Sequence, residues 1–172
     1  VTGPVLYAAS RLKVKTFIHE QNSIPGKSNT FLSKYVDKIA VSFKSSLDLF
    51  PKEKVVFTGN PCSETARNIL ECKKSEFGLK ENKKLVYIVM GSLGASKIND
   101  FLIKTLGLFN GKDYEVLFVT GKSAYDDIIK NKFPSNIKIV PYVDNQARLM
   151  KRADLIVSRC GATTLSEIIA LR

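Results

Sequence analysis

The chain has no tryptophan, one histidine and only three cysteines in 172 residues. Cys62, Cys72 and Cys160 lack CxxC or zinc-ligand spacing, which excludes a disulfide scaffold or zinc finger and predicts small buried thiols in a reducing compartment. The longest apolar run, Leu85–Met90, is far shorter than the roughly 20 residues of a membrane-spanning helix. A signal-peptide pattern is absent as well. We therefore expect a globular protein with an ordinary apolar core.

Acidic residues are comparatively few: 16 Asp and Glu stand against 27 Lys and Arg, a formal charge of +11. The excess is spread evenly, with +5 in residues 1–82 and +6 in residues 83–172. A basic surface attracts nucleic acid, anionic lipid or phosphorylated substrates, and only local motifs choose among them. Because the chain has no RNA-recognition signature and no aromatic-basic repeat, we expect no nucleic-acid partner.

Several catalytic signatures are also missing. The sequence contains no Gly-x-Ser-x-Gly elbow, no His-Glu-x-x-His helix and no Asp-x-Asp pair of the metal-dependent sugar-nucleotide transferases. Serine-hydrolase and metalloprotease chemistry is therefore unsupported, and we expect neither a metal nor another cofactor.

What the chain does have is an alternation of short apolar runs with helical patterns, which is typical of βαβ units and parallel sheets. The predicted fold class is therefore α/β. Strands are expected at residues 15–18, 38–42, 55–58, 85–90, 115–120, 137–140 and 154–158. Helices are expected at 125–131, at 145–152, from about Thr164, and along two stripes of core residues: Phe31, Leu32, Tyr35, Val36 and Ile39, and Ile98, Phe101, Leu102 and Thr105.

A domain boundary is predicted near Asn60-Pro61, because Gly59-Asn60-Pro61 disfavours both helix and strand. The domains would then be residues 1–62 and 63–172. The chain starts without Met and stops within an apolar helical pattern, so we expect a fragment of a longer protein.

Ligands of open parallel sheets collect at the carboxyl ends of the strands, so the loops that leave the strands are the candidate sites. The loop Gly91-Ser92-Leu93-Gly94-Ala95 follows a strand and opens a helix, which suits a phosphate because backbone N–H groups and the helix dipole face it. It lacks the Lys-Ser/Thr of a P-loop and the third Gly of a dinucleotide fingerprint, so a plain tight turn is the alternative.

A second strand, glycine loop and helix run from Ser158 to Glu167. Two anion-suited turns in one half of a sheet suggest a diphosphate-containing ligand between them. Glu167 has two interpretations: Thr164-Leu165-Ser166-Glu167 matches a capping box, and the alternative is contact of this carboxylate with the ligand.

A third loop, His19-Glu20-Gln21-Asn22, directly follows the strand predicted at residues 15–18. Four consecutive polar residues at the end of a strand are hard to explain as core. His19 suits either acid–base chemistry or positioning by hydrogen bonds. The next segment, Pro25-Gly26-Lys27-Ser28-Asn29, predicts a turn and a helix start, where Asn29 is either a cap or a site residue.

Together these motifs resemble the MurG family, the peptidoglycan transferases that move GlcNAc from UDP-GlcNAc onto lipid I to make lipid II. The resemblance covers the whole chain and rests on four motifs in order: His19-Glu20-Gln21-Asn22 with Pro25-Gly26 and Asn29; Gly59-Asn60-Pro61; Gly91-Ser92-Leu93-Gly94-Ala95 with Asn99; and Arg159-Cys160-Gly161-Ala162 with Ser166-Glu167-Ile168. It implies a GT-B fold of two Rossmann-like domains, both incomplete here, with residues 1–62 on the acceptor side and 63–172 on the donor side.

The resemblance also implies roles for individual residues. Glu167 would hold the ribose hydroxyls of the donor, and the backbone of Val143 would read the uracil edge. The donor diphosphate and sugar would be held by two loops and two supporting side chains: Gly91, Ser92 and Gly94; Gly161, Ala162 and Thr163; Asn99 and Arg159. On the acceptor side, Asn22 would approach the GlcNAc. Three further residues would line the catalytic cleft: His19, Glu20 and Asn29.

The implied chemistry is an inverting displacement, in which the MurNAc 4-hydroxyl of lipid I attacks the anomeric carbon as UDP departs, with no bound metal. The implied partners are UDP-GlcNAc, lipid I, an anionic membrane surface and other cell-wall synthesis proteins. The implied location is peripheral, on the cytoplasmic face of the bacterial plasma membrane. Lys27, Lys34 and Lys38 are candidates for contact with anionic lipid, with solvated helix lysines as the alternative.

The chain departs from the family pattern in several places. The family's N-terminal glycine-rich loop and a downstream Gln pair are absent, Ser63 stands where the family usually has Arg, and Leu93 stands where it usually has Gln. We therefore expect this chain by itself to be inactive. Another GT-B sugar-nucleotide enzyme and a non-catalytic nucleotide-sugar-binding module are the alternatives, whereas a dinucleotide-dependent oxidoreductase lacks its fingerprint.

Overall fold

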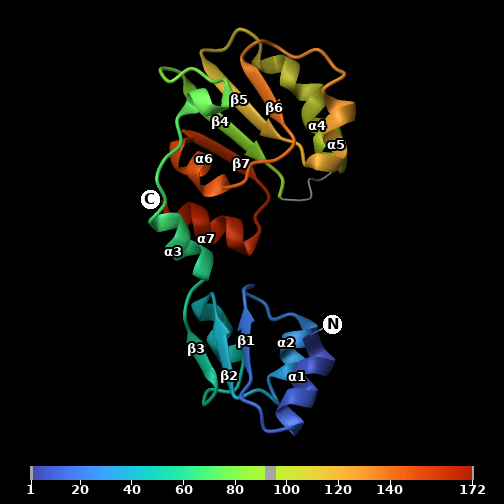
Figure 1. The fold of residues 1–172 in the computed structure, drawn as a ribbon, viewed down its shortest axis with the longest axis vertical. Helices are drawn as coiled ribbons and strands as arrows, with labels where there is room; N and C mark the ends of the chain where they lie inside the picture. The colour runs from blue at the N-terminus through green and yellow to red at the C-terminus, as the bar shows by residue number, and fades with distance from the viewer. Residues whose placement is uncertain (1, 92–95, 172) are drawn as a thin grey trace. The chain divides into compact units, whose positions relative to one another are not determined.

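The computed structural model describes residues 2–91 and 96–171. It divides into two compact units, Val1–Thr65 (unit 1) and Ala66–Arg172 (unit 2). Each unit contains one sheet, and every strand pair in the described part of the chain is parallel. The predicted α/β class with parallel sheets is therefore confirmed (Figure 1).

Unit 1 is built on a three-stranded sheet with the order β1-β2-β3. Its elements are α1 (Thr2–Arg11), β1 (Phe17–Glu20), α2 (Lys27–Leu32), β2 (Lys38–Val41), the 3-10 helix η1 (Lys44–Leu49), β3 (Val55–Phe57) and α3 (Pro61–Arg67), which runs across the boundary into unit 2. The core of this unit is small and apolar: Ile18, Leu32, Val36, Ile39, Val41 and Phe50. It fixes β1 beside β2, so the carboxyl ends of both strands meet at one edge.

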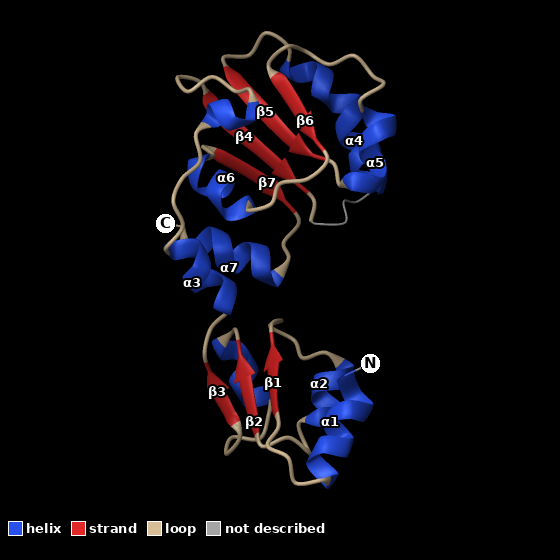
Figure 2. Cartoon of the chain, in the orientation of Figure 1, coloured by secondary structure: helices blue, strands red, loops and turns tan. Residues whose placement is uncertain are grey.

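Unit 2 has a four-stranded sheet with the order β6-β5-β4-β7. Its further elements are the 3-10 helix η2 (Lys74–Phe77), β4 (Lys84–Val89), α4 (Ser96–Leu106), the 3-10 helix η3 (Gly107–Phe109), β5 (Tyr114–Val119), α5 (Lys122–Ile128), β6 (Ile137–Val140), α6 (Gln146–Arg152), β7 (Leu155–Ser158) and α7 (Ala162–Ala170). Along β4, Tyr87 packs on the side of α6 and α7, and Ile88 packs on the side of α4. Helices thus cover both faces of this sheet (Figure 2), which explains its nearly continuous apolar strands.

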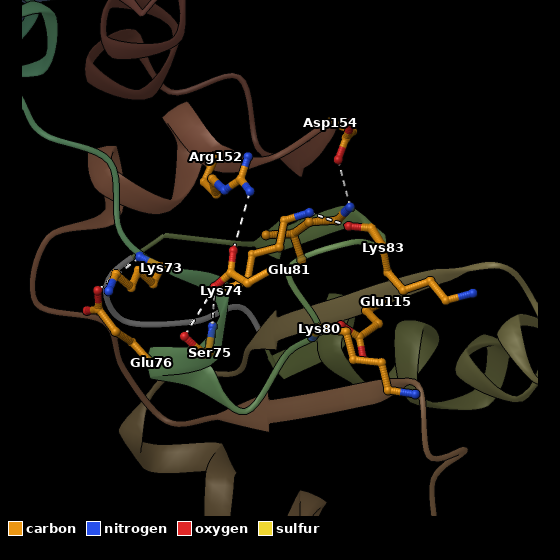
Figure 3. Close-up of polar contacts among 11 residues, drawn as sticks. Lys73, Lys74, Ser75, Glu76, Lys80, Glu81, Lys83, Glu115, Arg152 and Asp154 are labelled. Atoms are coloured by element: carbon orange, nitrogen blue, oxygen red, sulfur yellow. Dashed lines mark hydrogen bonds and ion pairs between the residues drawn. The ribbon is translucent and has the colours of Figure 1, made fainter.

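Polar contacts fix the amino ends of these strands (Figure 3). The buried Glu115 carboxylate accepts the backbone N–H of Lys80, and Asp154 accepts the backbone N–H of Leu85 at 2.8 Å. Glu81 accepts hydrogen bonds from the backbone N–H and hydroxyl of Ser75. These contacts hold the segment before β4 and the start of β4 against the amino ends of β5 and β7, at the edge opposite the loops considered below.

Two sequence predictions about unit 1 are wrong. The first strand covers Phe17–Glu20 and not residues 15–18, because hydrogen bonds from the next loop satisfy the buried Glu20 side chain. The stripe from Phe31 to Ile39 is not one helix, since α2 ends at Leu32 and Ile39 lies in β2. Nor are all stripe residues core: Phe31, Tyr35 and, in α4, Phe101 are exposed.

Further corrections concern α3, α1 and the cysteines. Gly59-Asn60-Pro61 does not exclude a helix, because α3 begins at Pro61, a position that needs no N–H donor, and the Asn60 side chain accepts the backbone N–H of Cys62 at 3.0 Å. The helix α1 was not predicted.

The prediction of three small buried thiols holds for one cysteine: only Cys72 is fully buried, whereas Cys160 is exposed. No described helix is both long and apolar enough to cross a membrane.

Candidate functional site

Glu20, the last residue of β1, organises the loop that follows it. Its side chain is buried, at 2% exposure, although it is a carboxylate. Oε1 accepts the backbone N–H and the side-chain amide of Asn22 at 2.9 and 3.0 Å. Oε2 accepts the backbone N–H of Gly26 and the side-chain amide of Asn29, both at 2.9 Å. Four donors therefore converge on one side chain and hold the loop in place.

These donors also set the ionisation of Glu20. Burial by itself raises the pKa of the Glu20 carboxyl, but the hydrogen bonds from Asn22, Gly26 and Asn29 outweigh it and hold the pKa below its ordinary value. The side chain is consequently an ionised, fully engaged acceptor at neutral pH. Such a carboxylate is a poor proton acceptor, so its contribution to a site is to hold its neighbours.

Asn22 and Asn29 are held on several sides. Asn29 donates to Glu20 from within α2, whose N-cap is Gly26, so the prediction that Asn29 caps a helix is wrong. Ser46 is fully buried, and its hydroxyl lies 3.1 Å from the carbonyl oxygen of Asn22 and 3.0 Å from that of Ser23. The result is an exposed Asn22 on a firmly anchored backbone.

His19 lies next to this loop but faces another segment. Its Nε2 is 3.2 Å from the Ser42 hydroxyl at the end of β2 and 3.2 Å from the carbonyl oxygen of Gly59. The structure thus brings the four predicted acceptor-side residues together: His19, Glu20, Asn22 and Asn29. It places the polar segment in the end of β1 and the loop after it, and not wholly after the strand.

In unit 2, the loops after β4 and β7 share a pocket of about 290 Å³ lined by Val89, Gly91, Gln146, Arg159, Cys160, Gly161 and Thr164. Gly91 has a φ of +95°, and a Cβ added there would collide with the guanidinium of Arg159. The backbone therefore requires a glycine at this point, whereas the guanidinium is the end of a flexible, exposed side chain that can move aside. A cation, a bare backbone and the start of a helix meet at the carboxyl edge of a parallel sheet, where an anion is favoured.

Glu167 lies in the second turn of α7 and not in a capping box. The helix begins at Ala162, with Gly161 as its N-cap and no side-chain cap, so Thr164 is already helical and the capping-box prediction is wrong. Burial raises the pKa of the half-buried Glu167 carboxyl. Among the described residues none donates a hydrogen bond to it. This carboxylate has the capacity to accept donors from a ligand.

Two other predicted donor-side residues are buried. Asn99 is 1% exposed, and its amide donates to the carbonyl oxygen of Thr120 at 2.8 Å, which ties α4 to the carboxyl end of β5. Among the residues that the structure describes, its buried Oδ1 has no hydrogen-bond partner. Val143 packs into the core beside Leu149. Both residues therefore hold the loops around the pocket.

The remaining predictions are met unevenly. Gly91, Arg159 and Gly161 line one pocket, and Ala162 and Thr163 form the first turn of α7 beside it. Ser92, Leu93 and Gly94 lie outside the described residues. Four lining residues were not predicted as site residues: Val89, Gln146, Cys160 and Thr164. Gln146 follows β6 at the same edge, so the rule about strand ends applies to it equally. A larger hollow of about 490 Å³ lies at the opposite, amino edge of the sheet.

Family models match both units of the chain. The glycosyltransferase family 28 C-terminal domain matches residues 85–172, and the family's N-terminal domain matches residues 1–41. A Bacillus cytotoxicus protein named "UDP-N-acetylglucosamine--N-acetylmuramyl-(pentapeptide) pyrophosphoryl-undecaprenol N-acetylglucosamine transferase" is 47% identical over 176 residues. A Halalkalibacterium halodurans protein of the same name is also 47% identical. Each comparison covers 99% of this chain and 48% of the other protein, so the chain spans about half the length of these relatives.

Solved glycosyltransferase structures are also similar to this chain. The crystal structure of Acinetobacter baumannii MurG matches with a TM-score of 0.67 and 27% identity, over 99% of this chain and 47% of that one. The calicheamicin glycosyltransferase CalG4 matches with a TM-score of 0.59 and 10% identity, over 95% of this chain and 49% of that one, a likeness of fold alone. The two parallel sheets of this chain and its likeness to these glycosyltransferase structures confirm the predicted GT-B class.

Proposed function

The chain belongs to glycosyltransferase family 28, and we propose that the protein of which it forms part transfers GlcNAc from UDP-GlcNAc to the MurNAc 4-hydroxyl of lipid I, forming lipid II. The observation that carries this proposal is the pocket between the loops after β4 and β7, where Arg159 lies against Gly91. A nucleotide diphosphate is the anion that such a pair of loops suits best.

The donor residues divide into three groups in this proposal. Gly91, Ser92 and Gly94 in one loop, and Gly161, Ala162 and Thr163 in the other, surround the diphosphate with backbone N–H groups. Arg159 neutralises part of its charge, and Asn99 keeps α4 in position. Glu167 accepts the ribose hydroxyls, and the backbone of Val143 meets the uracil edge.

In the reaction, the 4-hydroxyl oxygen of the acceptor forms the new bond to the anomeric carbon as the bond to UDP breaks. Negative charge grows on the departing diphosphate, and the loops of unit 2 stabilise it. Asn22 approaches the transferred sugar. Glu20 and Asn29 keep that loop in shape, and the base that takes the hydroxyl proton is not Glu20, whose oxygens are already filled.

The acceptor is a lipid, so we place the protein at the cytoplasmic face of the plasma membrane as a peripheral protein, in contact with other cell-wall synthesis proteins. Support comes from unit 1, where the exposed rings of Phe31 and Tyr35 lie 5.2 Å apart and where Lys27, Lys34 and Lys38 are exposed as well. Exposed aromatics flanked by lysines suit an anionic bilayer surface. Charge reversal of the three lysines should weaken co-flotation of the full-length protein with anionic vesicles and leave it unchanged with neutral ones.

The test of the proposed function is calorimetric titration of the full-length protein with UDP-GlcNAc and UDP-GalNAc, together with transfer to a lipid I analogue. Tighter binding of UDP-GlcNAc, its loss in Arg159→Ala, and transfer by the unaltered protein are expected. Binding that Arg159→Ala leaves unchanged would place the donor elsewhere. Nucleotide binding without transfer would favour a non-catalytic binding module.

A further inference from the structure

The last two residues of β1 serve different segments. Glu20 faces the loop of residues 21–29, as described above, whereas His19 faces away from it. The His19 ring meets the end of β2 at Ser42 and the carbonyl of Gly59, a residue 40 positions further along the chain. Gly59 belongs to the short connection that leads from β3 to α3.

The chemistry of this contact determines the state of the ring. A carbonyl oxygen only accepts hydrogen bonds, so we assign the proton to Nε2, which lies 3.2 Å from the carbonyl of Gly59; in the other tautomer Nε2 would accept the Ser42 hydroxyl at the same distance. In the assigned neutral ring the lone pair lies on Nδ1. With this assignment Nε2 is a donor and does not serve as a proton acceptor while the contact lasts.

The connection itself is pinned on several sides. The backbone N–H groups of Thr58 and Gly59 both donate to the carbonyl oxygen of Val41, at 3.2 and 3.3 Å. Gly59 has a φ of +74°, a left-handed backbone conformation that changes the course of the chain after β3. The buried Asn60 then caps the start of α3. The carbonyl oxygen of Gly59 accepts the neighbouring Thr58 hydroxyl at 3.1 Å, and His19 adds the contact that ties this carbonyl to another strand, β1.

We propose that His19 is a positioning residue, which fixes the turn Gly59–Pro61 of unit 1 through Nε2, and does not take the acceptor's proton. The kinetic consequence rests on the proposed function: the turn belongs to unit 1, which carries the acceptor-side residues, so a loosened turn disturbs the acceptor side and leaves the donor residues of unit 2 as they are. The turnover number then falls, while the affinity for UDP-GlcNAc is unchanged.

The experiment compares two variants of the full-length protein, His19→Gln and His19→Asn. The amide nitrogen of Gln falls near the position of Nε2, whereas that of Asn falls near Nδ1 and is too short to reach Gly59. Neither amide takes up a proton. Transfer kinetics, and hydrogen exchange of the backbone amides of residues 57–63, are measured for both.

We expect His19→Gln to keep kcat within about threefold and to keep these amides protected, while His19→Asn lowers kcat about tenfold, leaves KM for UDP-GlcNAc unchanged and speeds exchange, as the loss of one hydrogen bond predicts. Equal inactivity of both variants with unchanged exchange would show a proton acceptor and overturn the proposal. Unchanged exchange in both variants with normal activity would overturn it as well. If the unaltered protein transfers no GlcNAc, the proposed function fails, while the exchange comparison still decides whether His19 holds the connection.

Discussion

Both units present a glutamate near the carboxyl edge of a parallel sheet, and they treat it in opposite ways. In unit 1, Glu20 is almost fully buried and accepts four hydrogen bonds, which hold its pKa below the ordinary value. In unit 2, Glu167 is half-buried, receives no hydrogen bond from the described residues, and burial raises its pKa. All acceptor positions of the first carboxylate are used by the protein, and it holds a loop. The second carboxylate has unused acceptors and lies one turn of α7 after Thr164, which lines the anion-suited pocket.

This contrast separates a structural role from a binding role without reference to sequence position. A buried polar group that is fully hydrogen-bonded stabilises the fold, whereas one left short of partners opposes folding and is retained for another reason. Each prediction below asks whether the two glutamates differ as the structure says.

The largest effect is expected for Glu20→Ala. The substitution leaves four donors around Asn22, Gly26 and Asn29 without their acceptor, so the free energy of unfolding of unit 1 should fall by about 3 kcal/mol. Differential scanning calorimetry of this chain measures the change. Glu53→Ala, at an exposed position of the same unit, is the matched control. An equal loss of stability in both variants would show that the hydrogen bonds of Glu20 contribute no more to stability than an exposed glutamate does.

Gly91→Ala should have the next largest effect. Its φ of +95° disfavours any side chain, and the new Cβ collides with Arg159. We expect a loss of about 2 kcal/mol in stability and weaker UDP-GlcNAc binding in calorimetric titration. The double variant with Arg159→Ala removes the flexible side chain but not the backbone strain, so it should recover little of the stability. Full recovery would show that the backbone there needs no glycine.

Glu167→Gln is expected to weaken UDP-GlcNAc binding by about tenfold, because an amide is a poorer acceptor for ribose hydroxyls than a carboxylate. Stability should stay the same or rise slightly, since the burial penalty on the charge is removed. Glu64→Gln, an exposed position in α3, is the control. Lower stability with unchanged binding would make Glu167 a structural residue after all.

The pH dependence of stability should differ in sign between the two glutamates, and it should be the smaller for Glu167, because its carboxyl is only half-buried and partly screened by solvent. The lowered pKa of Glu20 gives stability that is present above the pKa of an unfolded glutamate and is lost as the pH falls through the folded value. The raised pKa of Glu167 gives the reverse: stability present below the unfolded value and lost as the pH rises through the folded one. Melting temperatures between about pH 3 and pH 7 for Glu20→Gln and Glu167→Gln check both signs.

The parts of the fold that the sequence predicts well are those in which local pattern and burial agree. Continuous apolar runs place β4, β5 and β6 to within a residue or so. The first strand is displaced by two residues because the burial of Glu20 depends on donors from a loop up to nine residues away. No local pattern contains that information.

The candidate site follows the same division. The rule that ligands gather after strands finds Gly91, Arg159 and Gly161 without knowledge of the fold. The capping box at Thr164 is misleading because α7 begins two residues earlier, on a glycine that needs no side-chain cap. Whether His19 faces a substrate or the chain itself depends on Gly59, forty residues away.

The most direct test of the contrast is the carboxyl ¹³C NMR titration of Glu20 and Glu167 in the full-length protein, with and without UDP-GlcNAc. The account predicts a pKa below the ordinary value for Glu20 that the nucleotide leaves unchanged. It predicts a raised pKa for Glu167 that falls on binding, because ribose hydroxyls donate to the charged form. A nucleotide-dependent shift at Glu20 with none at Glu167 would contradict it.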